Sequence, residues 1–532
     1  MTAAVVTETR AGVRPGDPRR AMVALAKAEA VRLLRHPVTI AGILLFVGTQ
    51  LYGWLSAGSD NYPVLQYEDW SKQFTALLTL GGAALVAVNL AALRAHRHGT
   101  TAVFDTLVLP APWRAGAFLL SVLPYSAVVA VLTGGRIGLL AAVPGAAGRP
   151  NPFELALYPA AVLLLGAVGV LLARWLRAAI VAPLLLMGLT AVTFAGALPS
   201  TPGATWLRWL LPVALEEPPM PLPVDLMARP AGRHLVYVLG LVALVAVAVL
   251  AVTGARGRRL TAAGAAGLSV AVLAGSAQFL PMSDAVRAAR STAAERPAEV
   301  QTCRRIDQVT YCAFDGFSSW IGGWDGVVRG VLRGAPDDRA RQPLVVRQRM
   351  STVDLYADGE SSRSAEQAAA AAAAWRRVDA RAGTPDAVTV GTRWGDGRSA
   401  ITFAGLVAYQ VVVGRGGPDG SQLCGARGVL VAWLAGQATP TAAAGLHEAD
   451  ATSWGALPFG DPQFPIGLSV PDREAAVALA LLNRPAADVA QVVRRSWAEL
   501  AAAKTSAERA GELFGVPVAP LPPEEERTVC GA

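Results

Sequence analysis

The stretch "FTALLTLGGAALVAVNLAAL", residues 74–93, contains no Asp, Glu, Lys or Arg. A helix rises about 1.5 Å per residue, so about 20 apolar residues cross the roughly 30 Å hydrocarbon core of a bilayer. Six further charge-free runs have a similar length. Together the runs predict seven membrane spans: Val38–Ala57, Phe74–Leu93, Ala115–Thr133, Leu155–Ala173, Ala178–Ala197, Leu235–Thr253 and Leu260–Leu280.

The composition places these spans in a chain with two unlike parts. The protein has 532 residues, of which 53% are hydrophobic and 16% charged, with a mean hydropathy of +0.40. The apolar residues concentrate before residue 282. We therefore expect a seven-span transmembrane domain over 38–281 and a separate domain over 282–532, preceded by a disordered, polar segment over 1–18.

The loop charges orient the spans. If the N-terminus is cytoplasmic, the cytoplasmic loops 1–37, 94–114, 174–177 and 254–259 carry 15 basic and 4 acidic residues, and the opposite loops carry 6 basic and 7 acidic residues. Lys and Arg accumulate on the cytoplasmic side of membrane proteins. Seven crossings then place the C-terminal domain outside the cell, in a multi-pass protein of the plasma membrane.

The net charge of +8 has the same origin. The C-terminal domain is nearly neutral, with 26 basic and 28 acidic residues from 283 onward. The excess positive charge therefore belongs to the cytoplasmic loops, where it faces anionic lipid. We expect the bilayer as a partner and no nucleic acid.

All four cysteines lie in the C-terminal domain: Cys303, Cys312, Cys424 and Cys530. An even number in an oxidising compartment indicates disulfides, and four cysteines allow three pairings. We favour Cys303–Cys312 with Cys424–Cys530, and buried free thiols remain the alternative. A zinc site is disfavoured because the spacings are unsuitable and His447 is the domain's one histidine.

The C-terminal domain is predicted to be mixed α+β. "LVVRQRMSTVDLYAD" (344–358) and "SAITFAGLVAYQVVVG" (399–414) resemble strands in their apolar and β-branched content. Helical patterns cover 364–381, 472–482 and 486–503. The expected fold class is an all-α polytopic bundle followed by an α+β extracytoplasmic domain.

An amphipathic helix precedes the first span. "RRAMVALAKAEAVRLLRH" (19–36) places apolar side chains roughly on one face, and Pro37 ends the helix. We expect this segment, 19–37 with its proline, to lie on the inner leaflet. The apolar positions are Met22, Leu25, Ala26, Val31, Leu33 and Leu34, and the polar positions are Lys27, Glu29, Arg32 and Arg35, whose basic members reach anionic headgroups.

The loop "RAHRHGTTAVFDTLVLPAPWR" (94–114) lies between the second and third spans. On a helix, His96 and His98 project about 200° apart, so they do not form a metal site. A plain connecting loop is one interpretation. However, "TAVFDTLVLP" resembles a short amphipathic helix ended by Pro110, which is typical of a docking element for a soluble partner.

The usual catalytic motifs are missing from the sequence. The chain has three lysines and none follows a glycine, so it contains no P-loop for ATP. It also lacks an HExxH zinc motif and a GxSxG nucleophile elbow. We predict no catalytic residues, no metal and no cofactor of its own.

Two segments carry a resemblance to ABC-2-type transporter permeases. "LAKAEAVRLLRHP" (25–37) resembles the amphipathic helix before their first span, and "HRHGTTAVFDTLVLPAPWRAGAF" (96–118) resembles the segment between their second and third spans. The resemblance covers about residues 20–255. It implies an ATPase-docking surface made of Arg94, His96, Arg97, His98, Gly99, Thr100, Phe104, Asp105, Leu107, Pro110 and Arg114.

The chain departs from this family in three ways. It adds a seventh span and an outer domain, and histidines stand where the family often has an acidic residue. The resemblance implies the membrane-spanning subunit of an ABC transporter, which exports its substrate with a second permease chain and a separate P-loop ATPase that binds the ATP. The alternative is a membrane-anchored extracytoplasmic protein for sensing or binding.

Overall fold

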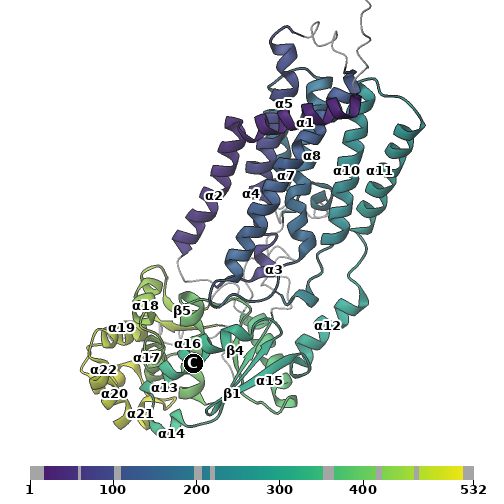
Figure 1. Cartoon of the computed structure of the whole chain (residues 1–532). Coiled ribbons are helices and arrows are strands. Elements are labelled where there is room, and N and C mark those ends of the chain that lie inside the picture. Colours follow the sequence, from purple (N-terminus) through teal and green to yellow (C-terminus); the bar gives the residue numbers. More distant parts are fainter. Residues whose placement is uncertain are drawn as a thin grey trace, which may run out of the picture.

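A bundle of long apolar helices carries a mixed domain at one end (Figure 1). The structure, a computed structural model, describes residues 17–57, 62–100, 109–196, 207–215, 222–350, 365–414, 422–460 and 467–518. Helix α1 (Pro18–Leu34) lies across the opposite end of the bundle. We call these two ends the domain end and the α1 end.

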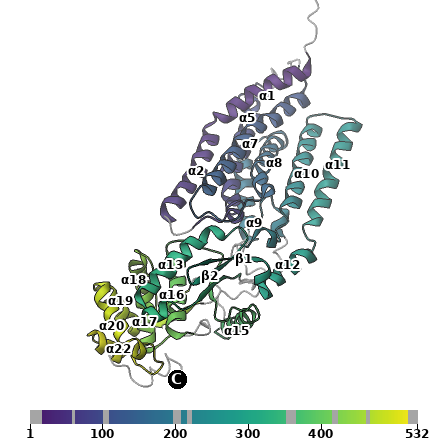
Figure 2. The same ribbon diagram turned by 60° about the horizontal axis from the view of Figure 1, so that its bottom comes forward.

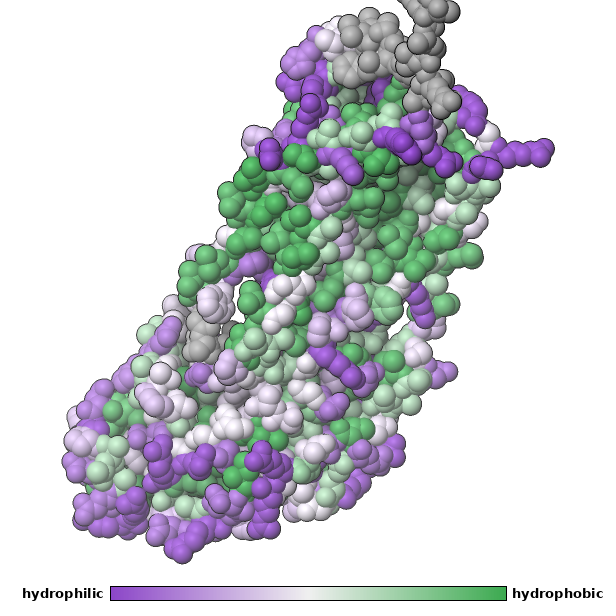
Figure 3. Space-filling model, in the orientation of Figure 1, coloured by the Kyte–Doolittle hydropathy of each residue, from purple (hydrophilic) through white to green (hydrophobic). Residues whose placement is uncertain are grey.

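Six helices among the described residues are long and apolar enough to cross a membrane. The second is a composite that runs from Leu65 to Arg97 through α3 (Leu65–Glu68), α4 (Gln73–Ala76), the π-turn η1 (Leu77–Gly81) and α5 (Gly82–Arg97). The other five are α2 (Pro37–Ala57), α7 (Ala111–Ala141), α8 (Pro152–Trp175), α10 (Ala231–Val252) and α11 (Arg258–Ala277). On the face shown in Figure 3, apolar residues gather in a broad band over these helices, which fits a multi-pass membrane protein.

The span expected over 178–197 is a shorter helix, α9 (Val181–Ala195), with 15 residues. At about 1.5 Å per residue it extends about 22 Å, less than the hydrocarbon core. Helix α8 ends at the α1 end and α10 begins at the domain end, so the chain between them passes from one end of the bundle to the other. Helix α9 lies on this passage, and residues 197–206 fall outside the described part.

Small residues bring the helices close together. A Cβ on Gly169 of α8 would stand 2.6 Å from the carbonyl oxygen of Leu85 in α5. The Asn89 side chain of α5 donates to the Gly169 carbonyl oxygen at 3.1 Å. Glycine therefore permits this crossing, and a buried amide fastens it. Helices α10 and α11 pack as a pair at one side of the bundle (Figure 2).

The C-terminal domain is built on a four-stranded sheet in the order β1-β2-β3-β4. Its strands are β1 (Gln301–Ile306), β2 (Val309–Phe314), β3 (Leu344–Gln348) and β4 (Val388–Val390). β1 and β2 are antiparallel, whereas β2, β3 and β4 are parallel. Helix α12 (Asp284–Glu295) connects α11 to the sheet.

Helices cover both faces of this sheet. Tyr311 on β2 donates to Asp325 of α13 (Ile321–Gly334). Arg347 on β3 faces the other way and pairs with Asp379 of α15 (Ala365–Arg381). Because neighbouring strand residues alternate between faces, α13 and α15 lie on opposite sides.

A helical subdomain completes the fold around the buried helix α17 (Gly425–Gly436). It comprises α16 (Arg398–Val413), α18 (Ala442–Ala451), α19 (Asp472–Leu482), α20 (Ala486–Arg495), α21 (Trp497–Leu500), α22 (Ala507–Phe514) and the hairpin β5 (Ala456–Phe459) with β6 (Leu468–Pro471). The short elements are α14 (Asp337–Ala340), η2 (Leu207–Leu210), η3 (Val224–Leu226), η4 (Pro297–Glu299) and η5 (Ser318–Trp320).

One predicted strand is wrong. Residues 399–413 belong to helix α16, and almost every one of them is buried. A helix buried on all sides carries apolar residues on all its faces. A run of 16 residues is long for a strand, and its length indicated a buried helix better than its β-branched content indicated a strand. The helices predicted over 364–381 and 472–482 are confirmed, and the segment 486–503 divides into α20 and α21. The strand expected over 344–358 is β3 for its first five residues, and 351–358 lie outside the described part.

The structure contains the expected disulfide between Cys303 and Cys312, which face each other across β1 and β2. Cys424 is disulfide-bonded as well. Its expected partner, Cys530, lies outside the described residues. An oxidised domain fits an extracytoplasmic location.

Candidate functional site

The predicted docking site includes three described parts: helix α1, the end of α5 and the start of α7. Asp17 caps α1 by accepting a hydrogen bond from the backbone N–H of Arg19 at 3.0 Å, and Pro18 occupies the first turn, where its missing N–H is harmless. The helix ends at Leu34, and Pro37 begins α2 rather than a loop.

Helix α1 packs on the bundle through one face and exposes the other. Its buried residues recur every three or four positions: Ala26, Glu29, Ala30 and Leu33. Lys27, Arg32 and Arg35 are exposed, as expected for a basic outer face. Val31, which was expected on the apolar face, is 49% exposed because it falls between the buried positions.

The buried member of the predicted polar set is Glu29. Its carboxylate accepts from Arg94 of α5 at 3.1 and 3.3 Å and from Arg32 at 2.7 Å. The Glu29 side chain is 5% exposed, and the Arg94 side chain is 41% exposed. The ion pair therefore joins the two predicted segments and fixes α1 to α5.

The "HRHGTT" motif ends helix α5. The backbone N–H of Thr100 bonds to the Ala95 carbonyl at 2.9 Å, and that of Gly99 bonds to the His96 carbonyl at 3.2 Å. Gly99 has φ +65°, a left-handed conformation that favours glycine. These two bonds form a Schellman cap. The Gly-Thr feature is thus a helix-ending signal in this chain.

The remaining predicted docking residues surround this cap. His96 and Arg97 are exposed in the last turn of α5, and His98 is exposed at its C-cap. The charge of Arg97 is favourable at the C-terminal end of a helix. Pro110 precedes the first residue of α7, and Arg114 lies half-buried in its first turn. Phe104, Asp105 and Leu107 lie outside the described residues.

His36 links α1 to the first span. Its Nδ1 accepts from the backbone N–H of Val38 at 3.2 Å, so it caps α2. Burial, with the charge of Arg94, lowers the pKa of His36. The neutral imidazole is the form that can accept this bond.

A second ionic centre, at the domain end, was not predicted. Glu154 of α8 pairs with Arg229 at 2.8 Å, and their side chains are 2% and 9% exposed. Gln73 also donates to Glu154 at 2.8 Å. The Arg229 guanidinium lies over the rings of Trp70 at 4.0 Å and Trp209 at 5.3 Å. The pair joins the start of α8 to the segment before α10, and Gln73 and Trp70 connect it to the composite second span.

Four polar side chains line one face of that second span: Gln66, Asp69, Trp70 and Gln73. All four are buried, and each has one polar atom with no hydrogen-bond partner among the described residues. Asp69 also accepts from the backbone N–H of Asn151 at the start of α8. Spacings of three and four residues place them together on a helical face. The same spacing is present in the sequence, but all four residues precede the predicted second span, which begins at Phe74.

The C-terminal domain forms hydrogen bonds with the loop between α7 and α8. Trp320 of η5 donates through Nε1 to the carbonyl oxygen of Gly145 at 2.6 Å, and Ser319 donates to that of Ala146 at 3.0 Å. The backbone N–H of Gly148 donates to Gly316 at 2.8 Å. A loop between two spans is therefore held by three hydrogen bonds to the domain.

The segment before the second span makes a further connection. The Tyr62 hydroxyl donates to Asp396 at 2.7 Å, and its backbone N–H donates to the Trp394 carbonyl at 2.7 Å. Val64 and Ala147 form a bridge and join the hydrophobic core of the domain. The domain and the bundle loops thus share one core at this junction.

Within the described residues, no group of three His, Cys, Asp or Glu side chains could hold a metal ion. Comparisons with known proteins give no assignment either: no protein family, curated protein or solved structure matches the chain.

Proposed function

We propose that the chain is the membrane-spanning subunit of an ABC transporter, with a separate ATPase at the α1 end. The observation that supports this most is the arrangement of that end. Helix α1 lies across α7 and is tied to α5 by Glu29 and Arg94, next to the exposed His96, Arg97 and His98. A basic platform anchored to two spans suits a partner that must move them.

The proposed mechanism uses this platform as a lever. ATP bound by the partner closes a pair of ATPase subunits, which push on α1 and on the end of α5 in two permease chains. The helical bundles then rock and open towards the other side of the membrane. The basic excess in these loops supports a cytoplasmic location for the α1 end. Export would then proceed from the α1 end towards the domain end.

A second candidate is a membrane-anchored protein that senses or binds an extracytoplasmic ligand. The observation that favours it is the size of the domain core, which continues into the loops of the bundle. A ligand that binds the domain could change the contacts between the domain and the α7–α8 loop. The two candidates differ in whether an ATPase binds the α1 end.

Affinity purification of the full chain tests the proposal. We expect a P-loop ATPase to co-purify with the wild type. The double variant Arg97→Glu and His98→Glu should reduce its recovery at least tenfold, because it introduces two negative charges into the basic platform. The matched control, Arg258→Glu with Arg259→Glu, alters exposed arginines in the first turn of α11 at the same end. Absence of an ATPase from the wild-type preparation would reject the transporter. An ATPase whose recovery survives deletion of 96–110 would reject the proposed docking surface.

The orientation has its own test. A reporter fused after Ala532 that is active only outside the cytoplasm should be active. Maleimide should label the native domain weakly without reductant, because Cys303 and Cys312 are paired. An inactive reporter, or labelling as strong as in the reduced protein, would place the domain in the cytoplasm.

A further inference from the structure

Three arginines lie near one another at the α1 end of the bundle. Arg114 stands in the first turn of α7, Arg174 in the last turn of α8, and Arg177 in the connection to α9. Arg114 and Arg177 are close enough to Arg174 for their charges to repel it. The Arg174 guanidinium also lies 5.9 Å from the ring centre of Phe118, one turn after Arg114 in α7. We call the three residues the arginine cluster.

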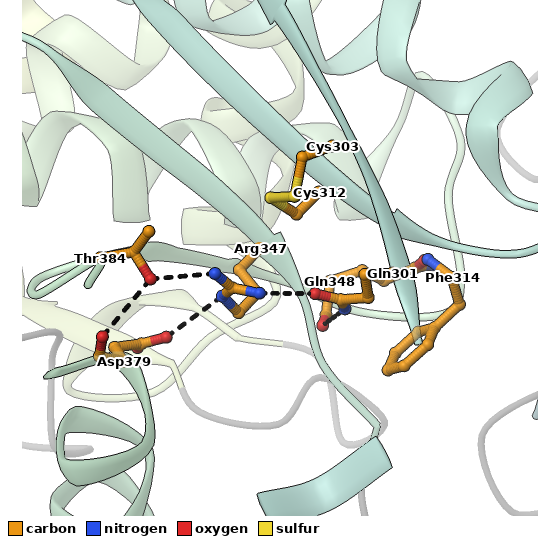
Figure 4. Close-up of a disulfide and its surroundings, with 8 residues drawn as sticks. All are labelled: Gln301, Cys303, Cys312, Phe314, Arg347, Gln348, Asp379 and Thr384. Carbon is orange, nitrogen blue, oxygen red and sulfur yellow. Dashed lines mark hydrogen bonds and ion pairs between the residues drawn. A yellow bond between two sulfur atoms is a disulfide. The ribbon is translucent and has the colours of Figure 1, made fainter. Parts of the chain in front are cut away.

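Arg174 has no counter-charge, unlike other covered arginines of this chain. Arg347, for example, lies against Asp379 (Figure 4). Arg174 is half-buried, and its Nε is shielded from solvent with no hydrogen-bond acceptor among the described residues. The charges that act on it, those of Arg114 and Arg177, are both positive. A partly buried charge without a counter-charge is unfavourable, so an anion beside Arg174 would be stabilising.

Arg177 occupies a backbone position that favours glycine. Its φ is +48°, and it directly follows Leu176, the residue that caps α8. Glycine is the usual residue at this position, because a side chain strains a left-handed conformation. Strained residues gather at functional sites, where the side chain has a use. The strain therefore points to a use for the charge of Arg177.

The helix dipole does not account for the whole cluster. A positive charge is favourable at the C-terminal end of a helix, which suits Arg174 and Arg177 at the end of α8. The same rule disfavours Arg114, because it stands at the N-terminal end of α7, whose first turn contains no acidic residue. An anion at these helix ends would interact favourably with all three charges.

The cluster lies next to an apolar surface at the edge of the spans. Trp175, which follows Arg174, is 71% exposed, and Ile180 and Leu184, one turn apart at the start of α9, are 62% and 55% exposed. Tryptophan favours the depth of the lipid headgroups. Arg174 and Trp175 are the last two residues of a 24-residue span, so the charge of Arg174 lies at headgroup depth.

We propose that the arginine cluster binds the phosphate group of an anionic phospholipid in the leaflet at the α1 end. The lipid supplies the counter-charge that Arg174 lacks, and Arg114 and Arg177 are its further cationic partners. The acyl chains cover the exposed apolar side chains at the start of α9, which favours a lipid over a free phosphate ion. Basic pockets between spans are suited to such headgroups. This inference does not depend on the proposed transport function.

Thermal unfolding of the full chain in a neutral detergent tests the site. Dioctanoyl phosphatidylglycerol, dioctanoyl phosphatidylcholine and sodium phosphate are titrated separately at constant ionic strength. The unfolding midpoint should rise and saturate with phosphatidylglycerol, as expected for a ligand of the folded state. Phosphatidylcholine has the same acyl chains and no net charge, and it should bind at least tenfold more weakly. Sodium phosphate should give no saturable rise over the same concentrations.

Three variants locate the binding site. Arg174→Gln should lower the affinity for phosphatidylglycerol at least tenfold, because charge-assisted hydrogen bonds are lost. Arg177→Gly should lower it about threefold, because the charge of an exposed arginine is screened by solvent. Glycine adopts the φ of Arg177 without strain, so this variant keeps the fold. The control Arg256→Gln removes an exposed arginine beyond the end of α10, at the same end of the bundle, and should leave the affinity unchanged.

Three outcomes would overturn the proposal: no saturable rise with phosphatidylglycerol, equal affinity for the two lipids, or an Arg174→Gln variant that binds like the wild type. A saturable rise with sodium phosphate at the same concentrations would also overturn it, because the ligand would then be a free anion. If Arg174→Gln does not fold, the other two variants decide. Equal affinities of Arg177→Gly and Arg256→Gln for phosphatidylglycerol would reject the cluster as the site.

Discussion

Each end of the bundle holds a buried glutamate paired with arginine, but the arginine side chains at the two ends differ in their exposure to solvent. At the α1 end, Glu29 is buried and both its arginines are at least 41% exposed. At the domain end, Glu154 and Arg229 are both almost fully buried. An exposed arginine can lose its partner and remain hydrated, whereas a buried one cannot. The α1 end is therefore built to adjust, and the domain end to stay fixed.

Removing Arg229 should have the largest effect. Arg229→Met leaves Glu154 buried with Gln73 as a neutral partner, and we expect a loss of about 3–5 kcal/mol in the free energy of unfolding. Far-UV circular dichroism of the full chain in detergent measures it. The double variant with Glu154→Gln should recover most of the loss. A single variant within about 1 kcal/mol of wild type would contradict a fixed domain end.

At the α1 end the corresponding change should cost less. Arg94→Ala leaves Glu29 with the exposed Arg32, and solvent screening limits the loss to about 1–2 kcal/mol. Hydrogen exchange in α1 should accelerate while that of α8 does not change. The control Arg32→Ala removes a partner that is 61% exposed and should cost less than about 0.5 kcal/mol. Equal effects of the two variants would contradict the assigned role of Arg94.

The hydrogen bonds between the C-terminal domain and the α7–α8 loop provide a second test of the fixed domain end. Trp320→Phe keeps an aromatic ring and removes the bond to Gly145, at an expected cost of about 1–1.5 kcal/mol. Hydrogen exchange at residues 145–148 and 316–320 should rise together. Trp454→Phe is the control, because Trp454 is 98% exposed. Faster exchange in only one of the two segments would show that the domain does not hold the loop.

The sequence predicted the α1 end better than the domain end. Charge-free runs located the long helices, because span length and hydropathy are local properties. The helix before the first span was also predicted, since its amphipathic pattern and the proline after it are local signals. The end of α5 was not, because the predicted span stops at Leu93 and the helix continues to Arg97. Pairing of Glu29 with Arg94 was not, because the two lie 65 positions apart.

The contacts that fix the domain end join residues that lie far apart in the sequence. Glu154 meets Arg229 across 75 positions, and Trp320 meets Gly145 across 175. In the sequence these residues appear as ordinary charges and aromatics beside spans. Only the spacing of Gln66, Asp69 and Gln73 was a local sign, and it indicated a helical start earlier than residue 74. The error at α16 is of another kind, because a buried helix and a buried strand have similar composition.

The smallest expected effect is that of Tyr62→Phe, at about 0.5–1 kcal/mol, because the hydroxyl bonds to the exposed Asp396. Burial and this hydrogen bond raise the pKa of Tyr62 to about 12, above its ordinary value near 10. Folding therefore stabilises the neutral phenol, so its contribution is complete below pH 10 and is lost as the pH rises to about 12. The difference in unfolding midpoint between wild type and Tyr62→Phe should disappear over that interval. Equal unfolding midpoints of wild type and Tyr62→Phe at every pH would mean that Tyr62 acts through packing alone, and that the fixed end rests on Trp320 and the shared core.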